Sequence, residues 1–106
     1  MMIAAALLAL QAPAAAAPGD ASDPFGAAVN AWALCTSERT RLYSATPRRD
    51  RHVVSAALYA CYDEERALRA LFVQRLGKKR GRRAMRETIE LTQRRLTADL
   101  QAIRGR

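Results

Sequence analysis

Apolar residues recur every three or four positions along most of the chain after residue 23, which is the period of an amphipathic α-helix. The first such run begins at Phe25, behind a capping residue at Ser22 or Asp23 and a proline at position 24. These features predict a first helix over about 24–45. No segment shows the strict apolar–polar alternation of a half-buried strand.

Two further helices are expected. Thr46-Pro47 resembles a cap followed by a proline, with Asp50 as an alternative cap, and predicts a second helix over about 47–76 that stops at Gly77. A third helix is predicted over 82–103. Its apolar stripe is the most regular in the chain and comprises Met85, Ile89, Thr92, Leu96, Leu100 and Ile103. The sequence therefore predicts an all-α fold, a small three-helix domain over 24–106.

The first two helices are expected to form an antiparallel hairpin. Residue 48, midway between Cys35 and Cys61, lies beside the predicted Thr46-Pro47 turn, so the two cysteines should face each other. The same register pairs Leu42 with Val54 and Phe25 with Leu71. The third helix either packs on this hairpin through its apolar stripe or uses the stripe to bind a second copy or another protein.

The first sixteen residues have the features of a cleavable signal peptide. Ile3 to Leu10 is a short apolar run, too short for a stable transmembrane helix across about 30 Å of hydrocarbon. The alanine-rich segment that follows supplies small residues for cleavage after Ala16. No Lys or Arg precedes the run, so an alanine-rich tail is the alternative. Residues 17–23 form a short linker of helix breakers and capping residues.

Export would place both cysteines in an oxidising compartment, where small domains often depend on disulfides. We therefore predict a Cys35–Cys61 disulfide and a periplasmic or secreted protein. Such a bond stabilises a fold by about 3 kcal/mol, chiefly by restricting the unfolded chain. Two buried free thiols are the alternative. Trp32 is expected to pack beside the cysteines, and Tyr59 and Tyr62 to pack at the edge of the core.

Charge is distributed unevenly along the 106 residues, whose formal net charge is +8. Residues 18–65 hold five Arg against seven acids, whereas residues 66–106 hold eleven Arg and two Lys against three acids, a net charge of +10. Basic clusters attract anions, and arginine offers forked donors suited to phosphate. The candidate anion-binding residues are Lys78, Lys79, Arg80, Arg82, Arg83 and Arg86.

The partners expected for these residues are anionic lipid, lipopolysaccharide or an acidic protein surface, with a solvated basic face as the alternative. Nucleic-acid binding is less favoured because no aromatic residue follows Phe72, so none lies within the basic run. It would become the better interpretation if the leader were retained and the protein stayed in the cytoplasm. Self-assembly through Met85, Ile89, Leu96, Leu100 and Ile103 is a further alternative.

Catalytic chemistry finds little support. His52 is the one histidine, and nine residues of helix would separate it from Cys61 by about 13 Å. Consecutive acids at positions 63–65 point in different directions on a helix and cannot form a catalytic pair. No metal-ligand set, phosphate loop or nucleophile motif is present in the sequence. We expect a non-enzymatic protein without a cofactor.

Overall fold

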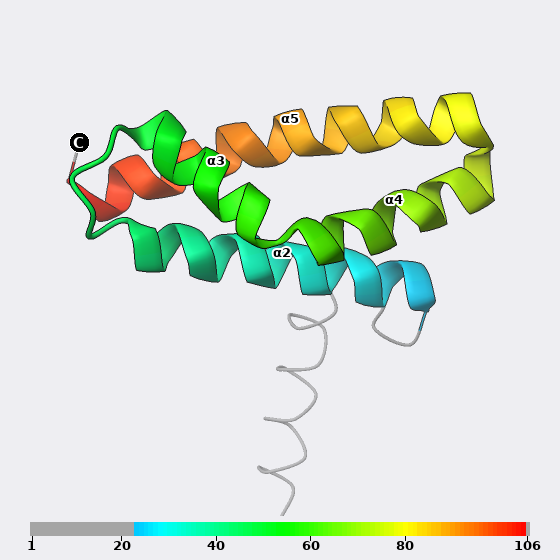
Figure 1. Cartoon of the computed structure of the whole chain (residues 1–106), viewed down its shortest axis with the longest axis horizontal. Helices are drawn as coiled ribbons and strands as arrows, with labels where there is room; N and C mark the ends of the chain where they lie inside the picture. Colours follow the sequence, from blue (N-terminus) through cyan, green and yellow to red (C-terminus); the bar gives the residue numbers. More distant parts are fainter. Residues whose placement is uncertain (1–22, 106) are drawn as a thin grey trace, which may run out of the picture.

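The computed structural model describes residues 23–105, which form four α-helices and no strand within that range (Figure 1). In chain order they are α2 (Pro24–Tyr43), α3 (Asp50–Ala60), α4 (Tyr62–Leu76) and α5 (Lys78–Ile103). The all-α prediction is confirmed for these residues. The predicted leader over 1–16 lies outside them, as does the linker up to residue 22. None of the described helices is long and apolar enough to cross a membrane.

The helices form a flat arrangement in which α2 and α5 lie on opposite sides and α3 and α4 lie between them (Figure 1). α3 and α4 form a bent pair that meets α2 at the bend, and α5 runs back from the end of α4 toward the loop between α2 and α3. All four helices contribute to one core. Its buried apolar members are Trp32, Val53, Val54, Leu58, Cys61, Leu68, Met85, Leu96 and Leu100.

The start of α2 is capped as its sequence predicts. Asp23 is the N-cap, its carboxylate accepts a hydrogen bond from the backbone N–H of Phe25 at 3.3 Å, and Pro24 occupies the first turn. The same carboxylate accepts a bond from Arg75 of α4 at 3.0 Å. Arg75 also lies 4.7 Å from the centre of the Phe25 ring. These contacts hold the beginning of α2 against the end of α4.

The predicted second helix over 47–76 is wrong in two respects. It begins at Asp50 rather than at Pro47, and it is interrupted at Cys61, whose backbone angles (φ −103°, ψ 29°) are not helical. Acids at positions 63–65 occupy the first turn of α4, where they favourably oppose the positive end of the helix dipole. This acidic run is therefore a helix-start signal, although within a continuous helix it would be ordinary surface.

The break also changes the register of the hairpin. Cys35 and Cys61 face each other as predicted, but Phe25 stacks edge-on against Phe72, with ring centres 5.0 Å apart, rather than against Leu71. Leu42, expected to face the buried Val54, is 63% exposed. A single helix through residue 61 would have packed against α2 in one register along its whole length. The interruption lets α3 and α4 pack against α2 in different registers.

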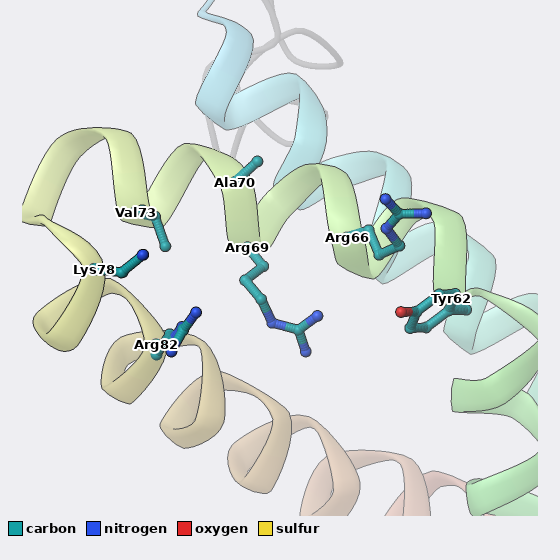
Figure 2. Close-up of a pocket in the computed structure, with 7 residues that line it drawn as sticks. All are labelled: Tyr62, Arg66, Arg69, Ala70, Val73, Lys78 and Arg82. Carbon is teal, nitrogen blue, oxygen red and sulfur yellow. The ribbon is translucent and has the colours of Figure 1, made fainter.

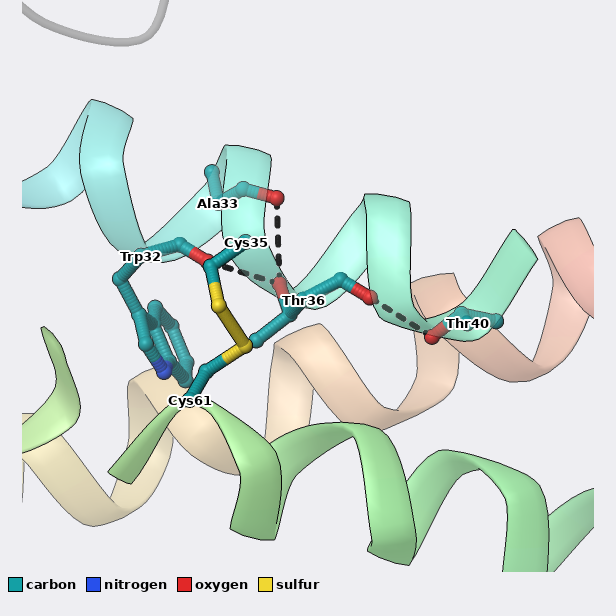
Figure 3. Close-up of a disulfide and its surroundings, with 6 residues drawn as sticks. All are labelled: Trp32, Ala33, Cys35, Thr36, Thr40 and Cys61. Carbon is teal, nitrogen blue, oxygen red and sulfur yellow. Dashed lines mark hydrogen bonds between the residues drawn. A yellow bond between two sulfur atoms is a disulfide. The ribbon is translucent and has the colours of Figure 1, made fainter. Parts of the chain in front are cut away.

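The cysteines form the predicted disulfide, with an S–S distance of 2.04 Å and Cα atoms 6.0 Å apart (Figure 3). Trp32 is 2% exposed and lies beside it, as expected. Two buried threonines on α2 are hydrogen-bonded within the helix: the Thr36 hydroxyl donates to the Trp32 carbonyl at 2.9 Å, and the Thr40 hydroxyl to the Thr36 carbonyl at 2.8 Å. Burying these hydroxyls therefore leaves no donor unsatisfied.

The α4–α5 hairpin depends on two glycines. Gly77 ends α4 with φ +86°, a conformation that favours glycine. The predicted third helix begins too late: α5 starts at Lys78 and includes Gly81, which is buried against α4. A Cβ at Gly81 would lie 2.6 Å from the Val73 Cα atom, so only glycine allows the two helices to approach this closely.

The C-terminal end of α5 holds the loop between α2 and α3. The Arg104 guanidinium donates to the backbone carbonyls of Ser44 (3.2 Å), Thr46 (2.7 Å) and Arg48 (2.8 Å), and to the Asp50 carboxylate at 2.7 Å. Both side chains of this ion pair are largely buried. One side chain thus satisfies three loop carbonyls and an acid from the first turn of α3.

Gly81→Ala should destabilise the fold. Alanine favours helix by about 1 kcal/mol over glycine, but the added methyl meets backbone and overpacking costs about 1–3 kcal/mol. We expect a lower midpoint in thermal unfolding followed by circular dichroism. Gln101→Ala, on the exposed side of α5, is the control and should have little effect. A Gly81→Ala protein as stable as the parent would show that the helices can separate at no cost.

Arg104→Lys should also destabilise the fold, by about 2 kcal/mol, because an ammonium cannot reproduce the forked pattern of donors. For a domain of this size, each 1 kcal/mol lowers the unfolding midpoint by about 4–8 °C. Arg94→Lys on the exposed side of α5 is the matched control. Equal midpoints for the two variants would contradict the role given to Arg104.

Candidate functional site

Basic side chains from α4 and α5 gather around a hollow of about 380 Å³ on one side of the α4–α5 hairpin (Figure 2). Arg66 and Arg69 come from α4, and Lys78 and Arg82 from α5. Lys78 and Arg82 point from α5 toward the hollow, and Arg69 extends toward it from α4 (Figure 2). Because each pair is three or four residues apart, each occupies one side of its helix. The remaining lining residues are Tyr62, Ala70 and Val73.

A second hollow, of about 370 Å³, continues the first along α5. The two share Arg69 and Arg82, and the second adds Arg86. We call these cationic residues the basic face, and they are Arg66, Arg69, Lys78, Arg82 and Arg86. Together the hollows form a strip of positive charge over apolar side chains, which suits a ligand that presents anionic groups.

Two carboxylates and one aromatic ring modify this charge. Arg69 pairs with Glu65 one turn earlier at 2.6 Å, the helix-surface pairing expected from their spacing. Glu90 lines the second hollow. The Arg66 guanidinium lies 5.8 Å from the centre of the Tyr62 ring, a cation–π contact that orients it without neutralising it. The basic face therefore keeps an excess of positive charge.

The structure divides the six predicted anion-binding residues. Lys78, Arg82 and Arg86 belong to the basic face. Lys79, Arg80 and Arg83 are exposed but line neither hollow, because successive residues of a helix project about 100° apart. The run that looks continuous in sequence is thus spread around the first turns of α5.

Arg66 and Arg69 were not among the predicted residues. The cysteines were paired by assuming that residues equally far on either side of a hairpin turn face each other. The same argument with the turn at Gly77 would have found Arg66 and Arg69. Val73 and Gly81 lie four residues on either side of Gly77 and are in contact, so Arg69 falls near Arg82 and Arg86. That argument requires a hairpin turn at Gly77, and the sequence interpretation instead placed a loop over 77–81.

The N-terminal end of α5 adds to the positive potential. Its N-cap, Gly77, provides no side-chain cap, and its first turn contains no acid. Helix N-termini carry unsatisfied N–H groups and a partial positive charge. A nearby cation therefore destabilises the helix, and a nearby anion stabilises it. Lys78 and its neighbours therefore add to the positive electrostatic potential at the start of α5, and the described residues of this turn include no acid that would lower it.

Side chains of types that can bind a metal ion lie close together around the disulfide. Within the described range, atoms of Cys35, Cys61 and Glu64 that could ligate a metal lie within 4.8 Å of one another. The two sulfurs are bonded to each other and so are not thiolates, which are the form that binds metals and attacks substrates. His52 is exposed on α3. The expectation of a non-enzymatic protein remains a prediction.

The apolar stripe of α5 lies largely inside the fold. Met85, Leu96 and Leu100 are at most 1% exposed, Ile89 packs against the core, and only Ile103 is half exposed. Of the two interpretations of this stripe, packing on the rest of the fold therefore agrees with the structure. Self-assembly through these residues would require the fold to open.

The two tyrosines of the α3–α4 bend do not pack as expected. Tyr59 is 82% exposed and Tyr62 is 48% exposed, so Tyr59 in particular is not at the edge of the core. Both line surface hollows instead.

Comparison with protein-family models, curated proteins and solved structures found no match to this chain.

Proposed function

We propose that this protein is an exported, non-enzymatic protein that binds an anionic membrane surface through the basic face of the α4–α5 hairpin. The observation that carries the proposal is that Arg66 and Arg69 of α4 and Lys78 and Arg82 of α5 line one hollow. Lipid and lipopolysaccharide phosphates are the anions that this arrangement suits.

Three properties of the basic face support phosphate groups as the ligand. Arginine guanidinium groups form two parallel hydrogen bonds to a phosphate. The cations rise from two folded helices, so only their side chains, and not the backbone, are ordered when they engage a surface. The uncapped start of α5 adds N–H groups and positive dipole potential beside Lys78.

The disulfide supports export. Disulfides persist in oxidising compartments and are rare in the cytosol. The Cys35–Cys61 bond joins α2 to the α3–α4 break and so constrains how these helices are placed. A protein built in this way is suited to the periplasm or the extracellular medium.

Binding should require anionic lipid and should weaken as salt is added. In a sedimentation assay, the protein should bind vesicles of phosphatidylcholine containing phosphatidylglycerol and should bind pure phosphatidylcholine weakly. Each basic residue near such a surface contributes about 1 kcal/mol. The triple variant Arg66→Gln, Lys78→Gln, Arg82→Gln should therefore bind about 100-fold more weakly.

The matched control is the triple variant Lys79→Gln, Arg80→Gln, Arg83→Gln. It removes the same charge from exposed residues outside the basic face and should lose far less affinity. Equal losses in the two variants would mean that net charge, not the basic face, determines binding. Equal binding of the parent protein to neutral and anionic vesicles would refute the proposal.

Export should be visible in the intact mass of the protein from its native host. We expect a mass that lacks the leader and that rises by two hydrogen atoms on reduction, from opening of the Cys35–Cys61 bond. Mass spectrometry before and after reduction measures both. A full-length mass with free thiols would contradict export and would favour the cytoplasmic nucleic-acid interpretation of the basic residues.

A further inference from the structure

Tyr59 is the most exposed of the large apolar side chains in the described part of the chain, at 82%. It lies near the end of α3 and belongs neither to the core nor to the basic face. A single exposed apolar residue is ordinary on a protein surface and needs no explanation alone. Tyr59, however, forms part of a hollow whose other residues indicate a use.

This hollow, of about 360 Å³, lies between the end of α2, the α2–α3 loop and α3. Tyr43 and Tyr59 contribute its aromatic surface, and Val53, 1% exposed, belongs to the core beneath it. Ala56 and Ala60 on α3 are small enough to leave the space open. Its volume is within the range of small-ligand sites and exceeds what one bulky apolar side chain requires.

The loop that borders the hollow is held in place from the far end of the chain. Thr46 and Arg48 both line the hollow, and the backbone carbonyl of each accepts a hydrogen bond from Arg104. Arg104 also binds the Asp50 carboxylate. A border fixed in this way loses little conformational entropy when a ligand binds.

Arg48 is the one charged residue among the described residues that line the hollow, and Asp63 lines an adjoining hollow that shares Tyr59 and Ala60. Arg49 and Arg51 follow Arg48 in the chain and are exposed. Asp50 is the one acid in this stretch, and its carboxylate is paired with Arg104 at 2.7 Å. Tyrosine and arginine are also the side chains that most often dominate protein–protein binding energy.

We propose that this hollow is a docking site for an acidic protein segment. The segment inserts one bulky apolar side chain between Tyr43 and Tyr59 and places a carboxylate against Arg48. An apolar floor with an arginine at its border matches this combination of anchor and charge. The site draws on α2 and α3 and shares no lining residue with the basic face, so it is independent of the proposed membrane binding.

The test uses three fluorescently labelled peptides with Phe, Trp or Leu at the centre and two Glu on each side, measured by fluorescence anisotropy with the full folded protein. At least one should bind. Replacing its central residue by Ala, or its Glu residues by Gln, should each weaken binding at least tenfold. If none of the three binds, or if the Ala-centred peptide binds equally well, the proposal is wrong.

Variants of the protein locate the site. Tyr59→Ala and Arg48→Gln should each weaken peptide binding at least tenfold, and Ala56→Leu should weaken it by filling the hollow. Leu91→Ala is the matched control, because Leu91 is 60% exposed on α5 and lies outside the hollow. Thermal unfolding checks that each variant is folded.

The basic-face variant separates the two proposals. The triple variant Arg66→Gln, Lys78→Gln, Arg82→Gln should bind the peptide as the parent does. Loss of peptide binding in that variant, with Tyr59→Ala unchanged, would assign the peptide to the basic face and overturn the docking site. If the triple variant loses vesicle binding but still binds the peptide, the result supports a docking site that is separate from the basic face.

Discussion

The disulfide between Cys35 and Cys61 fixes the point at which the chain changes direction. Cys61 is the one residue between α3 and α4, and the bond ties this interruption to the middle of α2. A short break between two helices would otherwise act as a hinge, because few backbone hydrogen bonds span it. With the bond in place, α3 and α4 hold separate directions, and Trp32 fills the space beside the sulfurs.

Two other contacts close the remaining ends of the molecule. At one end, Gly81 allows α5 to lie against the backbone of α4. At the other, Arg104 gathers the α2–α3 loop around its guanidinium. The two surfaces proposed to bind partners lie next to these closures: the basic face next to the glycine contact, and the docking hollow next to the arginine. Each surface is therefore built on rigid parts of the fold.

The sequence predicted what depends on periodicity and on simple register. Helical class, the Asp23 cap, the cysteine pairing and the burial of Trp32 all follow from spacing along one or two helices. It could not predict what depends on a local departure from regular helix. Continuous apolar spacing across Cys61 hid the break there. Gly81 was placed in a loop before the third helix, because its contact with Val73 is visible only in three dimensions.

Arg104 was missed for a related reason. An arginine at the end of a helix is common, and its three carbonyl partners carry no side-chain signature. The basic face was found only in part, because a run of cations in sequence is not a surface. Lys79 and Arg80 follow Lys78 in the chain but line neither hollow, whereas Arg69 is distant from Lys78 in sequence and lines the same hollow.

The contact at Gly81 also sets the width of the charged strip. Arg69 and Arg82 stand on two helices whose separation is limited by the backbone atoms of Val73 and by the missing side chain at position 81. The spacing between the two rows of cations is thus determined by a residue that carries no charge. In the proposed binding of anions, substitutions at this uncharged position would change which anions fit between the rows, so the proposed ligand preference would be linked to helix packing.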